Sequence, residues 1–302
     1  MTLTLTDKKY CINLLSRHSN ALFVYGDNMM RYGKGGQAVI RDCKNALGIA
    51  VKHAPKTEDK AYFTDADVDL FRTEVEAKFG VIRKALSEGR TVFWPLDGIG
   101  TGLANLAKRS PVCWELLCSY TRPMFQEYYP EGFDGLLVCG GREYEHEGYT
   151  HHLMSEWMRS NNRRKLIIQG KAKGADSHAK SFANDNDILM SSKAANWNKF
   201  GRGAGFIRNS EMASQMRAWR DMYGADVSVL AMPGGEGTAM MVDISRKAPN
   251  CFDVKVITTT PEAFMQASER VKPASRRPVK TVRSRFRRVA SVLPSIMHGG
   301  MS

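Results

Sequence analysis

The stretch DVSVLAMPGGEGTAMMV, residues 226–242, joins an apolar run to a Gly-rich turn and then to a segment with helical spacing. Three glycines and a proline directly after an apolar run are typical of a connection whose backbone is closely approached by another group. The stretch therefore predicts a β-strand, a binding turn and an α-helix in that order. It leaves open whether a ligand at the turn is only held or also cleaved.

The same alternation runs through residues 135–257. Short apolar runs separated by segments of helical spacing predict βαβ units, and therefore a parallel sheet of the doubly wound, Rossmann-like α/β class with helices on both faces. Ligands bind such sheets outside the carboxyl ends of the strands. We predict strands at 135–141, 165–170, 188–193, 226–232 and 253–257, and helices at 150–160, 175–186, 209–222 and 237–248.

The first 130 residues are also α/β, but their pattern is less regular. Strands are expected at 21–26 and 91–96, and amphipathic helices at 7–17 and 68–88. Proline and glycines at 128–135 interrupt the pattern. We therefore predict two α/β domains, a mixed one at 1–130 and a Rossmann-like one at 131–262, followed by a tail at 263–302.

Charge is concentrated in that tail. The chain of 302 residues has a formal net charge of +13, and nine basic residues without an acidic one lie between 270 and 302. Apolar residues at steps of three and four within 276–293 predict an amphipathic, arginine-rich helix, with a solvated tail as the alternative. The tail, rather than the body, is thus the candidate contact for nucleic acid or another polyanion.

Several classes of protein are excluded or disfavoured by composition. No apolar run is long enough to span a bilayer and the N-terminus lacks a secretory signal, so we expect a cytoplasmic protein, in the host cytoplasm if it is viral. The six cysteines have no metal-ligand spacing and are expected to be reduced thiols. We expect no metal and no cofactor; the oligomeric state is left open, with a homo-oligomer among the alternatives.

Four segments should converge at the carboxyl edge of the predicted sheet, because each follows one of its strands. Their glycines and a helix start turn backbone N–H groups outward, and basic residues add positive charge, which suits a phosphate. A single turn of this kind is more often just a tight connection, and Trp197 is expected to pack against the sheet rather than to stack on a base. The candidate ligand contacts are Gly140, Gly141, Arg142, Gly170, Lys173, Gly174, Asp176, Trp197, Arg208, Asn209, Pro233, Gly234, Gly235, Gly237 and Thr238.

The motifs GGRE, GKAKGADSHA, NWNKFGRGAGFIRNSEM and PGGEGTAMMV resemble, in this order, the YspA-type family of the SLOG superfamily, which includes Lonely-Guy-type phosphoribohydrolases and the DNA-processing protein DprA. The resemblance implies a Rossmann-like domain that binds a nucleotide-derived ligand. The phosphoribohydrolases carry PGGxGTxxE, whose glutamate works in N-glycosidic cleavage, but Met241 stands at that position here. Asp243 lies about 200° further round the helix and cannot replace it. Glu236 and Asp176 remain as candidate catalytic carboxylates, and holding a ligand is expected more than cutting it.

The first domain resembles a macrodomain in two Gly-rich loops, GDNMMRYGKGGQA (26–38) and DGIGTGLANL (97–106). The resemblance implies that ADP-ribose binds between them. Capping or turn formation after the strand is the alternative for Asp27 and Asn28. The implied contacts are Asp27, Asn28, Gly33, Gly35, Gly36, Gly98, Gly100, Thr101 and Gly102.

Together the two resemblances favour a protein that senses, sequesters or processes ADP-ribose, an NAD derivative, a nucleoside monophosphate or a related nucleotide, in bacterial or phage conflict. If it is an enzyme, it is expected to be a nucleotide or ADP-ribose N-glycoside hydrolase. A nucleic-acid-binding protein that uses the basic tail is the alternative from another class. A structural protein that has lost its ligand is disfavoured, because a dead site would not need the glycines of the loops.

Overall fold

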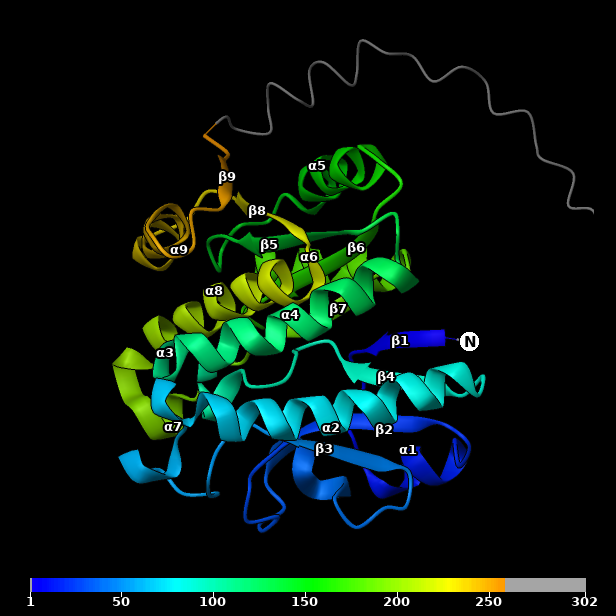
Figure 1. The fold of residues 1–302 in the computed structure, drawn as a ribbon. Helices are drawn as coiled ribbons and strands as arrows, with labels where there is room; N and C mark the ends of the chain where they lie inside the picture. Colours follow the sequence, from blue (N-terminus) through cyan, green and yellow to red (C-terminus); the bar gives the residue numbers. More distant parts are fainter. Residues whose placement is uncertain (1, 259–302) are drawn as a thin grey trace, which may run out of the picture. The chain divides into compact units, whose positions relative to one another are not determined.

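The computed structural model describes residues 2–258 and contains two parallel β-sheets flanked by helices (Figure 1). The chain is therefore of the α/β class, as the sequence predicts. Within the described residues, no helix has both the length and the apolar character needed to cross a membrane. The tail at 263–302, with its predicted amphipathic helix, lies outside the described residues.

The second sheet has the doubly wound strand order β7-β6-β5-β8-β9, and every neighbouring pair is parallel. All five strands lie where the alternation of apolar runs and helical segments predicts them. The order reverses between β5 and β8, which is the point where ligands bind in such sheets. The strands are β5 (Phe133–Cys139), β6 (Arg164–Gln169), β7 (Leu189–Ser192), β8 (Asp226–Ala231) and β9 (Asp253–Val256).

Alternating side chains of the second sheet enter two different cores, as the two-residue period of a strand requires. Leu136 and Val138 pack in one cluster with α5 (Glu147–Arg159) and α6 (Ala175–Asp185). Leu137 and Cys139 pack in another with α8 (Ala204–Tyr223) and α9 (Glu236–Arg246). Figure 1 shows α5 and α8 on opposite sides of β5 and β8. Both faces of this sheet are therefore covered by helices.

The first sheet is also parallel and has the order β1-β4-β2-β3. Strands β2 and β4 were expected from the sequence, whereas β1 and β3 were not. Its strands are β1 (Thr2–Thr6), β2 (Leu22–Asp27), β3 (Ala46–Ala50) and β4 (Thr91–Pro95).

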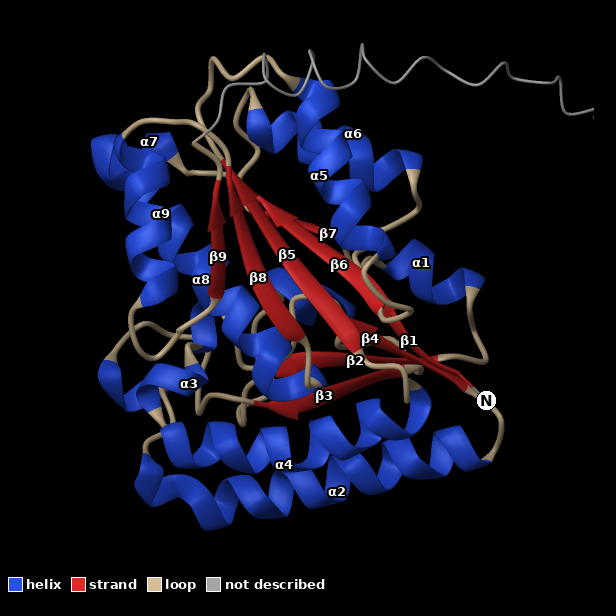
Figure 2. Cartoon of the chain, turned by 90° about the horizontal axis from the view of Figure 1, so that it is seen from above, coloured by secondary structure: helices blue, strands red, loops and turns tan. Residues whose placement is uncertain are grey.

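The helices of the first half match the expectations only in part. The long helix α2 (Val68–Ser87) occurs as predicted and lies beside α4 (Pro111–Tyr128), which was not predicted (Figure 2). The helix expected at 7–17 is shortened to α1 (Ile12–Arg17), so that prediction is wrong at its start. Asp7 instead accepts a hydrogen bond from the Met190 N–H, and the Tyr10 ring packs edge-on against Phe23.

Helix α8 joins the two sheets. Its Trp219 indole donates to the Leu96 carbonyl at 2.8 Å, and its Tyr223 hydroxyl donates to the Pro95 carbonyl at 3.0 Å. Apolar residues of both sheets belong to one buried cluster, which also contains residues of α2, α4, α8 and α9. The two sheets thus share a core, and the predicted division at residue 130 stays a prediction.

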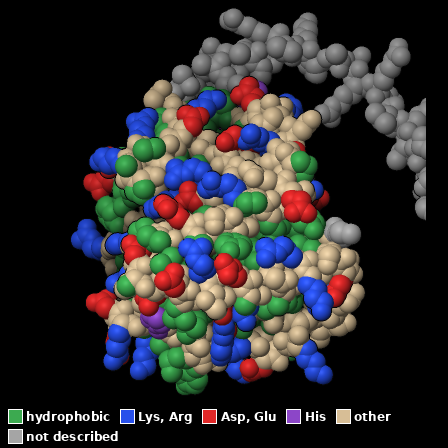
Figure 3. Space-filling model, viewed as in Figure 1, with side chains coloured by type: hydrophobic (Ala, Val, Ile, Leu, Met, Phe, Trp, Pro, Cys, Tyr) green, Lys and Arg blue, Asp and Glu red, His purple; other side chains and the backbone are tan. Residues whose placement is uncertain are grey.

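The surface of the described residues carries mixed charge. On the face seen in Figure 3, Lys and Arg side chains alternate with Asp and Glu, and no field of one sign covers it. Many charged side chains of the described residues are paired, for example Lys34 with Asp42 and Arg164 with Glu131. This view gives no separate support for a large polyanion contact on that face.

Candidate functional site

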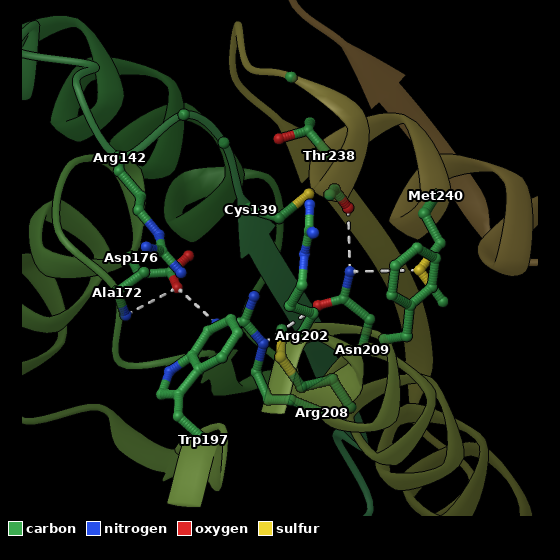
Figure 4. A pocket seen from close by; sticks show the side chains of 17 residues that line it. Cys139, Arg142, Ala172, Asp176, Trp197, Arg202, Arg208, Asn209, Thr238 and Met240 are labelled. Atoms are coloured by element: carbon green, nitrogen blue, oxygen red, sulfur yellow. Dashed lines mark hydrogen bonds and ion pairs between the residues drawn. The ribbon is translucent and has the colours of Figure 1, made fainter. Parts of the chain in front are cut away.

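A cavity of about 270 Å³ lies at the carboxyl edge of the second sheet, beside the ends of β5 and β8 (Figure 4). The segments after β5, β6 and β8 and the segment that leads into α8 all contribute to its wall, as the parallel topology predicts. We call it the edge cavity. The predicted residues that line it are Gly140, Gly141, Arg142, Asp176, Trp197, Arg208, Asn209, Gly235, Gly237 and Thr238.

The turn between β8 and α9 needs glycine at Gly234 because other backbone lies against it. A Cβ at Gly234 would lie 2.6 Å from the Gly141 nitrogen and would also collide with the Thr238 hydroxyl. Gly141 in turn donates from its N–H to the Pro233 carbonyl at 2.8 Å. The two Gly-rich turns are therefore packed directly on one another.

Gly235 and Gly237 have a different environment, because nothing lies within 4 Å of a Cβ built on either of them. Gly235 is the N-cap of α9, with φ −89°, so no left-handed conformation requires glycine there. The N–H groups of Gly235, Glu236 and Gly237 donate to no acceptor in residues 2–258, whereas those of Thr238 and Ala239 donate to the Gly235 carbonyl. The start of α9 thus presents free donors and a positive dipole end beside the edge cavity.

A chain of polar contacts connects three of the segments around the cavity. The Asp176 carboxylate accepts from the Ala172 N–H at 3.1 Å and lies 3.6 Å from Arg208. Arg208 donates to the Gly170 carbonyl at 2.7 Å and to Asn209 Oδ1 at 3.1 Å. Asn209 Nδ2 then donates to the Gly237 carbonyl at 2.9 Å. Much of the hydrogen-bonding capacity of the Arg208 guanidinium is therefore already used by partners within the protein.

Asp176 is the carboxylate that the cavity wall contains. It is 5 % exposed, and its burial raises its pKa above the ordinary value, against the lowering effects of the Ala172 N–H and of Arg208. Cys139 also lines the cavity; burial, with a contribution from the charge of Asp176, raises the pKa of its thiol to about 12. The site thus combines a carboxyl group that is easier to protonate with a thiol that stays protonated at neutral pH.

The cavity wall also differs from the sequence-based expectations around the start of α8. Trp197, the first residue of α7 (Trp197–Phe200), is 47 % exposed and lines the cavity, so the expectation that it packs against the sheet is wrong. The Arg142 guanidinium lies 5.3 Å from the centre of its ring. Helix α8 begins five residues earlier than predicted, which brings new residues to the wall. The lining residues that sequence reasoning missed are Cys139, Ala172, Arg202, Gly205, Phe206, Met212 and Met240.

Several predicted residues are close to the cavity but do not line it. Glu236 is exposed at the first turn of α9, and Met241 is fully buried in the core and does not line the cavity. Gly174 has φ +69° and packs against the Gly141 carbonyl, and Gly170 lies beneath Arg208. The predicted residues outside the wall are Gly170, Lys173, Gly174, Pro233, Gly234 and Glu236.

The two Gly-rich loops of the first half lie together, but their polar residues have protein partners. Gln37 bridges the loops, accepting from the Gly26 N–H at 3.0 Å and donating to the Gly98 carbonyl at 3.3 Å. Asp27 is buried between Arg41 and Arg31, and Asn28 donates to the Tyr32 carbonyl at 2.8 Å. These contacts fit the capping alternative for Asp27 and Asn28.

The remaining residues of these loops fall into two groups. Thr101 donates to the Asp97 carbonyl at 2.9 Å, Gly98 packs beside Met222, and Gly33 and Gly100 pack beside Pro55 and Leu106. By contrast, Cβ atoms on Gly35, Gly36 and Gly102 would meet nothing within 4 Å. None of the nine predicted ADP-ribose contacts of the first half lines the edge cavity. ADP-ribose binding at these loops stays a prediction.

Metal ligation finds no support at either place. Among residues 2–258, no group of three or more His, Cys, Asp or Glu side chains is arranged to hold a metal ion.

The fold and the site together define a Rossmann-like α/β protein with a small cavity at the carboxyl edge of its doubly wound sheet. Residues 5–120 match the model of a family described as "Family of unknown function (DUF7831)". The match begins within β1, covers β2, β3 and β4 and ends within α4, so it does not include the edge cavity. Comparison with curated proteins gave no match, and neither did comparison with solved structures.

Proposed function

We propose that the protein binds a phosphate-bearing nucleotide ligand, such as ADP-ribose, an NAD derivative or a nucleoside monophosphate, in the edge cavity. The observation that carries the proposal is the open backbone at Gly235–Gly237, whose N–H groups have no acceptor among the described residues. Phosphate oxygens are strong acceptors, and a helix start of this kind suits them.

Glycine at the N-cap fits this interpretation, because it allows the helix to start without a side chain that occupies the first N–H groups. Ser, Asp or Asn would accept hydrogen bonds from these groups of α9, and glycine is less favourable for the helix by only a few tenths of a kcal/mol. Neither steric contact nor backbone conformation demands glycine at Gly235. An uncapped start instead leaves these donors available to a ligand.

Replacement of Gly235 by Asp separates binding from folding. The carboxylate of Gly235→Asp would cap α9, so the free energy of unfolding should be kept or slightly raised, while its charge would repel phosphate. In thermal-shift titrations with AMP, NAD and ADP-ribose, we expect a ligand to raise the Tm of the parent and not that of the variant. Gly148→Asp is the matched control, because Gly148 is also an open, exposed glycine in the first turn of a helix, away from the cavity.

Two results would contradict the proposal. If Gly235→Asp binds its ligand as tightly as the parent, the phosphate is not at the start of α9. If none of the nucleotides changes the Tm of the parent, the protein is not a receptor for this class of ligand. The nucleic-acid alternative would then rest on the tail, whose removal should abolish salt-dependent DNA binding.

Asp176 favours a second candidate function, N-glycosidic cleavage of the bound nucleotide. Departure of a base is helped by a group that donates a proton, and a buried carboxyl with a raised pKa is suited to that role. Glu236 is less suited, because it is exposed and outside the cavity wall. Release of free base from AMP, NAD or ADP-ribose by the parent, and its loss in Asp176→Asn, would support cleavage. If the parent releases no free base, the protein binds the nucleotide without cleaving it.

A further inference from the structure

We infer that the edge cavity holds its ligand in one direction, with phosphate beside Arg202 and an aromatic base against Trp197 and Arg142. This inference rests on the proposed function and adds the residues that distinguish the two ends. It also assigns the charge on the phosphate to Arg202, which was not among the predicted residues, rather than to Arg208.

Of the three arginines of the wall, Arg202 is the one without a side-chain partner among the described residues, because Arg142, which makes no hydrogen bond or ion pair either, lies over the Trp197 ring. The Arg202 side chain is exposed and makes no hydrogen bond or ion pair within the described residues, whereas Arg208 already bonds Gly170 and Asn209 and lies beside Asp176. Arg202 belongs to the short turn Gly201–Gly203, so it has a glycine on each side. In Figure 4 its guanidinium points toward the segment that carries Thr238, at the start of α9. The Arg202 guanidinium and the free N–H groups of α9 therefore lie at the same end of the cavity, where one phosphate can accept hydrogen bonds from both.

The opposite wall is aromatic. Figure 4 shows Trp197 and Arg142 on the side of the cavity that carries Asp176, away from Thr238 and Met240. The Trp197 ring is half-exposed although it lines a cavity, and Arg142 covers only part of it at 5.3 Å. Phe206, 55 % exposed, is the second aromatic residue that lines the cavity. Exposed rings beside arginine are the surfaces on which nucleobases stack, because every base has an aromatic face.

The order of these groups along the wall gives the ligand a direction. Phosphate belongs at the end with the free N–H donors of α9 and the Arg202 guanidinium, and the base belongs at the end with the exposed Trp197 ring, where Arg142 already lies over the ring face. The ligand class that satisfies both ends is a nucleoside phosphate, since neither a nucleoside nor a sugar phosphate engages both. Asp176 lies at the base end, which is where a proton donor to a departing base would have to be.

Three probes and two variants test this direction by isothermal titration calorimetry: AMP, adenosine and ribose 5-phosphate against the parent, Arg202→Gln and Trp197→Ala. Arg202→Gln should weaken AMP and ribose 5-phosphate about tenfold and leave adenosine unchanged. Trp197→Ala should weaken AMP and adenosine about tenfold or more and leave ribose 5-phosphate unchanged. Lys199→Gln and Phe200→Ala are matched controls, because both residues are exposed in the same segment and lie outside the wall.

The opposite effects of the two variants on ribose 5-phosphate and adenosine distinguish this inference from the proposed function. If Gly235→Asp abolishes AMP binding while Arg202→Gln and Trp197→Ala bind all three probes like the parent, the cavity binds nucleotides but the assigned direction is wrong. If Trp197→Ala weakens ribose 5-phosphate and Arg202→Gln weakens adenosine, the direction is reversed. If the parent binds none of the probes, the inference and its basis both fail. Circular dichroism and Tm confirm that each variant is folded.

Discussion

Asn209 connects helix α8 to the start of α9, because its amide donates to the Gly237 carbonyl at 2.9 Å while its oxygen accepts from Arg208 at 3.1 Å. It is 4 % exposed, so water cannot replace these partners. One side chain thus fixes the position of the Gly-rich turn and the orientation of an arginine in the cavity wall. The shape of the edge cavity therefore depends on Asn209, which also lines its wall.

Replacement of Asn209 by Ala should therefore destabilise the fold. The change removes the hydrogen bonds of the Asn209 side chain to the Gly237 carbonyl and to the Arg208 Nε–H, each of which contributes about 0.5–1.5 kcal/mol to the free energy of unfolding. Urea denaturation of Asn209→Ala measures this loss. Ser210→Ala, at the neighbouring exposed position of α8, should change the free energy by less than about 0.5 kcal/mol. Equal stability of the two variants would contradict the connecting role of Asn209.

Cysteine labelling reports whether the side of the edge cavity formed by Cys139 stays closed to solvent. Burial raises the pKa of Cys139 and of Cys118 to about 12, whereas Cys11 and Cys251 are exposed. Because the thiolate is the reactive form, we expect iodoacetamide at neutral pH to label Cys11 and Cys251 first, and Cys118 and Cys139 only after denaturation. Peptide mass spectrometry identifies the labelled positions. Early labelling of Cys139 would mean that its end of β5 opens to solvent in the native state.

The first half of the chain offers a clean test of the resemblance to a macrodomain. Gly35 has φ −76° and open space around it, so Gly35→Glu can be made without strain, whereas Gly100 has φ +80° and packs on Leu106. If ADP-ribose binds between the two loops, Gly35→Glu should remove one binding event and leave the edge cavity unaffected. Calorimetry with ADP-ribose measures both events. A single binding event that Gly35→Glu does not change would remove the support for a second site.

How much of this arrangement can be predicted from sequence depends on how local its cause is. The strands of the second sheet and the convergence of its loops follow from apolar runs bounded by glycine, which are local patterns. The start of α8 at Ala204 was missed because GRGAG has the composition of a loop, and with it Arg202, Gly205 and Phe206 were missed. Strands β1 (TLTLT) and β3 (ALGIA) are as long as the predicted β4, but neither is a continuous run of large apolar residues.

The sequence alone also does not determine which partner each charged side chain binds. Arg142, Arg202 and Arg208 are equivalent in a sequence, yet only the structure shows that Arg208 is occupied by Gly170 and Asn209. In the same way, Asp27 has the spacing of a ligand contact but is held by Arg31 and Arg41, which come from different turns. The shared core around α8 likewise depends on contacts between residues more than a hundred positions apart, such as Trp219 and Leu96.

Asp176 predicts a dependence of stability on pH. Its pKa is raised in the folded protein, chiefly by burial, so the folded state binds more protons than the unfolded state between the ordinary pKa and the raised one. The free energy of unfolding contributed by this group therefore falls as the pH rises through that window. An asparagine keeps an oxygen that can accept from the Ala172 N–H but carries no charge to bury. Asp176→Asn should then be more stable than the parent at neutral pH, and the difference should disappear as the pH falls toward the ordinary pKa of aspartate.

Thermal denaturation of both proteins across this pH range measures the effect. Asp185→Asn is the matched control, because Asp185 is exposed at the end of the same helix and should show no such trend. A variant that is less stable than the parent at neutral pH would mean that attraction to Arg208 outweighs the cost of burial. A raised stability would instead show that the protein keeps a charged group in the cavity wall at the expense of its own fold. Such a cost is expected where a carboxylate serves binding or proton transfer rather than folding.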